Sequence, residues 1–276
     1  MAICKSLTAP LAKTCDLSAG GVKRIFIGNY TLPSYTLTNG LITTLTPDPT
    51  NTVTTTGTIN NSLVAGSYVA TTVVITGDYT SIFITGKIFK YTYNTQFGTG
   101  YWIGPALSSS YNAGTGKTTI TPDYTSNFAP VLGLSVNGAA PNNTNNQTVS
   151  TYLFFEVATN KNVCNFQETT AIDLANGTTF FNQILTLVLT RREKAKRDYI
   201  NSLIDGQKDL LIIVQDSNGI YWLMGLFEGA YVTGIDGATG VAKSDRNGYE
   251  ITFTAMERLQ AYEVQESAIS SYLVTA

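Results

Sequence analysis

The stretch LLIIVQDSNGIYWLMG at residues 210–225 decides the fold. An uninterrupted aliphatic run from Leu210 to Val214 predicts a strand, and the segment from Ile220 to Gly225 predicts a second one. Asp216, Ser217, Asn218 and Gly219 between them favour a tight turn, so we expect a β-hairpin. The turn lacks the further oxygen ligands and the closing glutamate of a calcium loop.

The segment upstream of this hairpin predicts the flanking helix. In RREKAKRDYINSLIDG at 191–206, Ala195, Tyr199 and Leu203 recur at every fourth position, with Ile200 and Ile204 beside them. We expect a helix over about 191–205, because a glycine at 206 stands where a helix would end. A strand is predicted on its N-terminal side at 183–190. Downstream we expect GAYV at 229–232, a flexible glycine-rich stretch at 234–240, a DRNG turn at 245–248 and a last strand at 249–256.

The middle of the chain has a different composition. Between Leu41 and Phe155 threonine, glycine, asparagine and tyrosine are abundant, and only six residues are charged. Runs rich in β-branched and aromatic residues predict strands at 68–75, 81–85, 87–93 and 152–157, and an asparagine-rich loop at 141–147. Short strands at this spacing are typical of a sandwich or a barrel. We expect an inserted threonine-rich β-sandwich domain.

The segment NAGTGKTTI at 112–120 looks like a phosphate-binding loop, but the pattern fails at two points. Tyr111 holds the position of the first glycine, and the following TTITP reads as a strand stopped by proline instead of a helix. We therefore interpret the segment as a hairpin turn before a threonine-rich strand.

Composition excludes several classes of function. The 276 residues carry a net charge of −2 and only 13% charged residues, so no overall positive field gathers nucleic acid. The absence of histidine removes the usual general base and metal ligand. Cys4, Cys15 and Cys164 have no paired spacing, so we expect a reducing compartment, no disulfide framework and no metal site. We expect neither a secretion signal nor a membrane-spanning helix.

The order of these elements resembles virion tail and neck proteins of tailed bacteriophages, especially those infecting Bacteroidota, including the crAss-like group. The likeness rests on the strand, basic helix, strand, DSNG turn, YWLMG strand, GAYV, glycine loop and DRNGYEITF strand, and on CDLSAGGVKRIFI at 15–27. It covers roughly 12–30 and 165–265, and leaves out the threonine-rich middle.

The resemblance implies a mainly β (α+β) fold, a tail-tube-like β-sandwich or rolled sheet with one flanking helix. Residues 1–45 and 160–276 would form a ring module, and 46–159 the inserted β domain. It further implies a structural, non-enzymatic protein of the virion tail or neck, made in the host cytoplasm. Copies would join into a homo-oligomeric ring or tube around the DNA path, beside other tail, neck or portal-proximal proteins. We expect no catalytic residue, no cofactor and no membrane partner.

The basic run has two interpretations. Five of the chain's seventeen basic residues fall within seven positions, namely Arg191, Arg192, Lys194, Lys196 and Arg197. They could face DNA in a channel. Alternatively they form a solvated helix face or pair with acids such as Glu257, Glu263 and Glu266 of another subunit, which we favour.

Two alternative functions remain open from the sequence. The middle aromatics could bind host-surface glycans, although we expect them to fill a β core; they are Tyr91, Tyr93, Phe97, Tyr101, Trp102 and Tyr111. Paired carboxylates could support glycoside hydrolysis, although turn chemistry already explains most of them; they are Asp216, Glu228, Asp236, Asp245 and Glu250.

Overall fold

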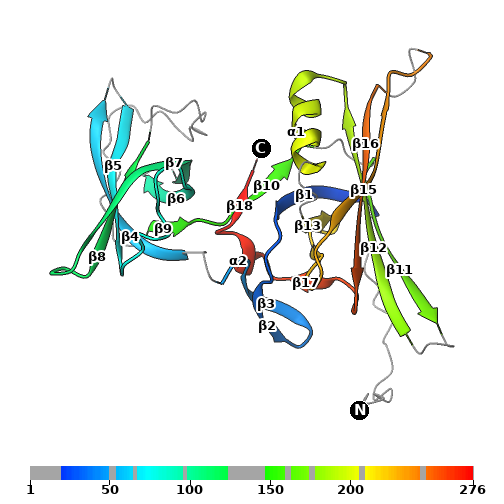
Figure 1. The fold of residues 1–276 in the computed structure, drawn as a ribbon, viewed down its shortest axis with the longest axis horizontal. Coiled ribbons are helices and arrows are strands. Elements are labelled where there is room, and N and C mark those ends of the chain that lie inside the picture. The colour runs from blue at the N-terminus through cyan, green and yellow to red at the C-terminus, as the bar shows by residue number, and fades with distance from the viewer. Residues whose placement is uncertain are drawn as a thin grey trace.

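A computed structural model describes residues 20–49, 54–64, 67–95, 98–123, 147–158, 163–173, 178–204, 209–242 and 247–275. The described chain is mainly β and forms an eight-stranded sheet, a four-stranded sheet and a closed barrel (Figure 1). In Figure 1 the eight-stranded sheet lies between the barrel on the left and the four-stranded sheet on the right. The predicted mainly β fold with one flanking helix is confirmed. Within the described ranges, no helix has the length and apolar character needed to cross a membrane.

The eight-stranded sheet is built around the segment that decides the fold. Its strands follow the order β18 (Leu273–Val274), β10 (Phe154–Val157), β1 (Val22–Asn29), β13 (Leu210–Asp216), β14 (Tyr221–Met224), β17 (Tyr262–Val264), β3 (Leu41–Thr46) and β2 (Ser34–Thr38). Leu210, Ile212 and Val214 of β13 point into one core, and Leu211 and Ile213 point into another. The aliphatic run has no polar alternation because this central strand is buried on both faces.

The four-stranded sheet covers one face of the eight-stranded sheet. Its order is β11 (Asn165–Asp173), β12 (Thr178–Thr190), β16 (Gly248–Glu257) and β15 (Tyr231–Ala238). The shared core joins Leu185 and Leu187 of β12 and Phe253 of β16 to Ile25 of β1. Helix α1 (Lys194–Ile204) closes this core at one end with Ile200 and Leu203. On the other face of the eight-stranded sheet, a second core packs under the short helix α2 (Glu266–Ile269).

The threonine-rich middle is a barrel and not the sandwich that we expected. Its strands close in the order β4 (Thr54–Val64), β5 (Ser67–Thr76), β8 (Lys117–Pro122), β7 (Gly98–Asn112), β6 (Ile88–Thr95) and β9 (Gln147–Ser150). Closure results because β9 pairs with both β4 and β6. One interior cluster around Phe83, Phe89 and Ile120 fills the barrel.

The barrel strands span 54–150, whereas the segment 154–157 pairs with β1 in the eight-stranded sheet. The expected range 46–159 for the inserted domain therefore includes a strand of the other module. The two parts meet where Ile103 of β7 packs on Leu153 and Val274. At this junction the buried Lys90 donates from Nζ to the carbonyl of Leu273 at 2.7 Å, and burial lowers the pKa of Lys90 to about 8.

One strand prediction inside the barrel is wrong. The segment 81–85 forms turns, because the amides of Ile82 and Phe83 both donate to the carbonyl of Tyr79. Phe83 is fully buried and packs edge-on against Phe89, with 5.5 Å between ring centroids. Phe83 and the half-buried Ile82 therefore pack in the barrel core, while Ile84 is 60% exposed, and the run forms no strand.

The two hairpin turns are confirmed. The GTGKTT motif begins in the turn between β7 and β8, where Asn112 Oδ1 accepts from the amide of Gly114 at 2.9 Å. In the DSNG turn, Asp216 Oδ1 accepts from the amides of Asn218 and Ile220 at 2.8 and 3.0 Å. Neither turn opens a helix, so the phosphate-loop likeness of the first has no structural counterpart.

The glycine-rich stretch and the buried face of the helix differ from the predictions. The stretch from Gly234 is not a flexible loop, because β15 continues to Ala238 in register with β16 after a bulge at Val232. On the helix, Ala195 and Ile204 are exposed instead of buried. The predicted helix end at 206, the first half of the DRNG turn and most of the asparagine-rich loop lie outside the described residues.

Candidate functional site

The basic run lies at the entry and first turns of α1. Arg191 precedes the helix with a φ of 63°, and its amide donates to the carbonyl of Asn247 at 2.6 Å. The helix is anchored by the buried Ile200 and Leu203. This anchoring turns the face that carries Lys194 and Arg197 toward solvent.

Three of the basic side chains form ion pairs with acids of their own segment. Lys194 Nζ lies 3.2 Å from Asp198 Oδ2, and Lys196 Nζ lies 2.9 Å from Glu193 Oε1. Arg197 also reaches Asp198, at 3.2 Å. The hydrogen bond from Lys196 lowers the pKa of Glu193. Residues 191–198 carry five basic and two acidic side chains, so these ion pairs leave the segment with a surplus of positive charge.

Arg192 makes a different contact. Its Cζ lies 5.3 Å from the centroid of the Tyr249 ring on β16. Of the acids expected to pair with the run from another subunit, Glu257 is only 1% exposed, so it is not a surface acid. Glu263 and Glu266 are exposed.

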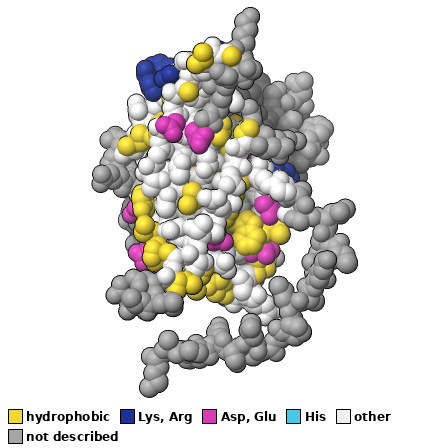
Figure 2. Space-filling view, turned by 90° about the vertical axis from the view of Figure 1, so that its right-hand side faces the viewer, with side chains coloured by type: hydrophobic (Ala, Val, Ile, Leu, Met, Phe, Trp, Pro, Cys, Tyr) yellow, Lys and Arg dark blue, Asp and Glu magenta, His cyan; other side chains and the backbone are white. Residues whose placement is uncertain are grey.

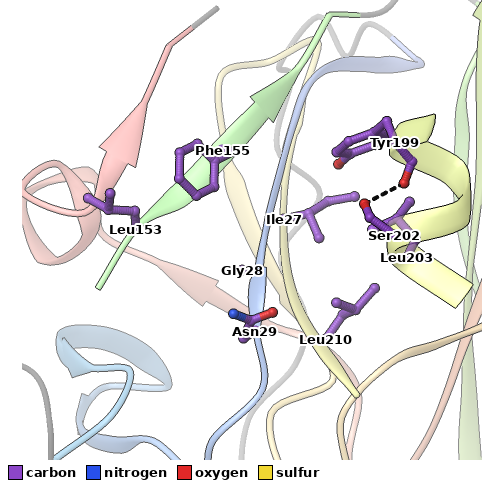
Figure 3. A pocket seen from close by; sticks show the side chains of 9 residues that line it. All are labelled: Ile27, Gly28, Asn29, Leu153, Phe155, Tyr199, Ser202, Leu203 and Leu210. Atoms are coloured by element: carbon purple, nitrogen blue, oxygen red, sulfur yellow. Dashed lines mark hydrogen bonds between the residues drawn. The ribbon is translucent and has the colours of Figure 1, made fainter. Parts of the chain in front are cut away.

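An apolar groove opens beside the C-terminal half of α1 (Figure 3). It has a volume of about 270 Å³ and lies between the helix, β1 and β10. Its lining residues are Ile27, Gly28, Asn29, Leu153, Phe155, Tyr199, Ser202, Leu203 and Leu210. Phe155 is 42% exposed at the rim, and burial raises the pKa of Tyr199 to about 12. The groove therefore offers a mostly apolar surface with a few polar groups, which is typical of a binding site.

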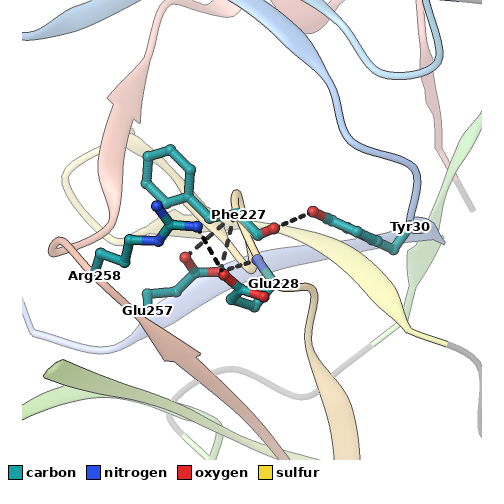
Figure 4. Close-up of polar contacts among 5 residues, drawn as sticks. All are labelled: Tyr30, Phe227, Glu228, Glu257 and Arg258. Carbon is teal, nitrogen blue, oxygen red and sulfur yellow. Dashed lines mark hydrogen bonds and ion pairs between the residues drawn. The ribbon is translucent and has the colours of Figure 1, made fainter.

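A polar cluster joins the two sheets at the loop between β14 and β15 (Figure 4). The carboxylate of Glu257 accepts from the amides of Phe227 and Glu228 at 3.1 Å each. Tyr30 Oη donates to the carbonyl of Phe227, and Arg258 pairs with Glu228 at 3.2 Å. Gln183 Oε1 accepts from the amide of Gly225 at 3.1 Å. These side chains fix a loop backbone, which is a structural task.

The carboxylates considered for hydrolysis do not converge. The carboxylate of Asp216 accepts hydrogen bonds from the amides of its own turn, and Glu228 pairs with Arg258. Asp236 and Glu250 oppose one another across β15 and β16, on the open face of the four-stranded sheet and away from the groove. Asp245 lies outside the described residues. Within the described ranges no cluster of metal-ligating side chains is present.

Of the middle aromatics, Tyr91 is buried in the barrel core and Tyr111 is exposed. The side chains of Tyr93, Phe97, Tyr101 and Trp102 lie outside the described part of the chain. Among the aromatic side chains that the structure describes, none forms an assembled surface for glycans.

The outer face of the four-stranded sheet is almost uncharged. Cross-strand register places Ile184 beside Thr254 and Thr186 beside Thr252 on this face. Its only described charges from β15 and β16 are Asp236 and Glu250. Figure 2 shows this side of the molecule as largely white and yellow, with acidic side chains in magenta at several places and dark blue only toward its margin.

Sequence reasoning located the basic helix but missed the groove and the role of Glu257. The signal for Glu257 was present, because strand alternation places it on the same face as Phe253 and Ala255. The groove had no such signal, because its walls come from parts of the chain that are far apart in the sequence, near residues 28, 154 and 199–210. Comparison of the chain with protein-family models, with curated proteins and with solved structures finds no match.

Proposed function

We propose that this chain is a structural subunit of a bacteriophage tail or neck, which self-assembles into a ring or tube that forms part of the DNA conduit in the virion. The order of elements that resembles such proteins falls in the eight- and four-stranded sheets and α1. The barrel is then an insertion into that module.

The observation that carries the proposal is that β11 and β15 form the two edges of the four-stranded sheet, with no further strand of the described chain paired to either. β11 is a nine-residue edge strand that pairs in unbroken register with β12, without a bulge or a proline. β15 is an eight-residue edge on the other side. A long regular edge presents unpaired backbone groups that a second strand can satisfy.

Among the described strands, the other sheets have no comparable edge. The barrel is closed, and the edge strands of the eight-stranded sheet have two residues in β18 and five in β2. Pairing of β11 with β15 of the next copy would continue the sheet from subunit to subunit and leave its almost uncharged face along the inside. Such a face suits DNA passage, since DNA can slide past a surface without strong phosphate contacts.

Mass and shape at rising concentration test this proposal. We expect native mass spectrometry and negative-stain imaging to show closed rings or stacked tubes with one dominant copy number. A chain that remains strictly monomeric at high concentration would refute the proposed function.

Two adjacent proline variants, Thr169→Pro and Thr170→Pro, test the role of the edge. Along an antiparallel edge strand, alternate residues direct their N–H to the partner strand or to the open side. One variant should therefore keep the thermal midpoint of the wild-type monomer while it loses assembly, and the other should lose stability. If the tolerated variant still forms rings, β11 is not the assembling edge.

A further inference from the structure

One patch on the outside of the barrel is buried although it faces away from the barrel core. Phe89 of β6 belongs to the interior cluster, so strand alternation directs its neighbours Ile88 and Lys90 outward. Lys90 lies in register with Ile103 of β7 and with Ser150 of β9, which therefore share its face. Lys90 and Ile103 are nevertheless only 4% exposed, and Ser150 is 1% exposed. A part of the chain outside the barrel must cover these residues, which we call the docking patch.

The cover of the docking patch comes from β18 and from the residue just before β10. Ile103 packs with Leu153 and Val274 in one apolar cluster. Lys90 Nζ donates to the carbonyl of Leu273 at 2.7 Å. Because a buried ammonium group is costly without hydrogen-bond partners, this bond favours one arrangement of the barrel against β18.

β18 belongs at the same time to the eight-stranded sheet. It pairs in parallel with β10, where Leu273 lies opposite Phe154 and Val274 lies opposite Phe155. The amide of Phe154 also donates to the carbonyl of Tyr272 at 2.9 Å. Figure 1 shows β18 on the side of the eight-stranded sheet that faces the barrel. A strand of two residues thus joins the two parts of the fold.

The chain itself crosses between the barrel and the eight-stranded sheet at two places. One crossing joins β3, which ends at Thr46, to β4, which begins at Thr54; the other joins β9, which ends at Ser150, to β10, which begins at Phe154. Parts of a chain that are joined by short segments and by a small contact move relative to one another by default. The contact of the docking patch with β18 therefore bears on the orientation of the barrel.

We propose that β18 is a lock that holds the barrel in one orientation against the eight-stranded sheet. While β18 is paired with β10, the barrel and the sheets move as one body. When β18 leaves, the docking patch loses its cover and the barrel rotates about its two chain crossings. The same step makes β10 the edge strand of the sheet, because β18 is the last strand in its order. An exposed edge strand can accept a strand of another protein, so release of the lock would couple barrel movement to binding.

Distances between spin labels within one copy test the lock. The labels are placed on Leu107→Cys of the barrel and Met256→Cys of β16, at side chains that are each 51% exposed. Cys4 and Cys15 are replaced by serine so that they take no label, and Cys164 is buried. Dilution of the labelled protein into unlabelled protein restricts the measurement to distances within one copy, whatever the assembly state.

Two variants open the lock in different ways. A chain that ends at Tyr272 lacks β18, and a chain that ends at Val274 keeps it as the matched control. Lys90→Glu replaces the donor by a carboxylate, which cannot donate to the carbonyl of Leu273. Lys87→Glu makes the same change of charge at a half-buried lysine of the barrel and is its control. Circular dichroism checks that each protein is folded.

We expect a narrow distance distribution in the wild-type protein and in both controls, and a distribution at least about twofold broader in both test variants, because the barrel then lacks its fixed contact. Equal widths in the wild-type protein and the test variants overturn the lock. A broad distribution in the wild-type protein also overturns it, since the barrel would then move with β18 in place. If the shortened chain does not fold, Lys90→Glu decides, and a narrow distribution there refutes the proposal. None of these outcomes depends on whether the protein forms rings.

Discussion

Glu257→Ala should lower the free energy of unfolding by about 2 to 4 kcal/mol, because it leaves two amide donors in a part-buried site without an acceptor. The carboxylate of Glu257 is 1% exposed and accepts from Phe227 and Glu228. Both donors belong to the loop that joins β14 of one sheet to β15 of the other. Loss of the acceptor should therefore loosen the connection between the two sheets. Urea unfolding followed by circular dichroism measures the change.

The control for this variant is Glu263→Ala, which removes an exposed glutamate from β17. Exposed substitutions of this type change stability by no more than about 0.5 kcal/mol. Glu257→Gln should fall between the two, since its amide oxygen still accepts a hydrogen bond while its NH₂ group adds a donor. Equal losses in Glu257→Ala and Glu263→Ala would contradict the structural role of Glu257.

The pH dependence of the same site has a definite sign. Burial is the largest influence on Glu257 and raises its pKa, although the amide donations of Glu228 and Phe227 oppose it. A carboxyl group with a raised pKa in the folded state binds more protons there than in the unfolded state. The wild-type protein should therefore lose stability relative to Glu257→Gln as pH rises from the unfolded pKa, near 4.5, through the folded one. Unfolding curves for both proteins at pH 4 to 7 measure this difference, and a difference that stays constant would contradict it.

The elements of the fold could be predicted because local chemistry determines them. The run from Leu210 to Val214 has only apolar side chains to place, and the DSNG turn supplies its own hydrogen bonds through Asp216. The strand prediction for 81–85 was wrong because the apolar content of this segment equals that of a strand. Its turns are instead formed by hydrogen bonds to the carbonyl of Tyr79 and by the burial of Phe83. The packing of Phe83 into the barrel core is a tertiary contact, so composition does not reveal it.

The candidate site was predictable only in part for the same reason. The charge of 191–197 is visible in the sequence, but its pairing with Glu193 and Asp198 depends on where the helix begins, at Lys194. The groove requires Leu153 and Phe155 to lie beside residues of α1. That proximity follows from the pairing of β10 with β1, which the domain range 46–159 did not anticipate.

Gly248→Ala is the second substitution with a large expected effect. A Cβ at Gly248 would lie 2.1 Å from the carbonyl oxygen of Leu189 and 3.1 Å from Cα of Thr190, and both are backbone atoms that no side-chain rotation can move. We expect a loss of about 3 kcal/mol, at the upper end of overpacking effects, because the end of β12 must shift. The shift would also reach the start of α1. Arg191 follows Thr190 in the segment that leads into the helix, and its amide donates to the carbonyl of Asn247, the neighbour of Gly248.

Gly234→Ala is the matched control for Gly248→Ala, because both glycines lie in the four-stranded sheet. A Cβ at Gly234 would meet Thr252 at 3.8 Å, which is ordinary contact, so the change in stability should stay within about 0.5 kcal/mol. Differential scanning calorimetry of both variants measures the contrast. Equal thermal midpoints for the two variants would contradict the predicted clash between a Cβ at position 248 and the carbonyl oxygen of Leu189.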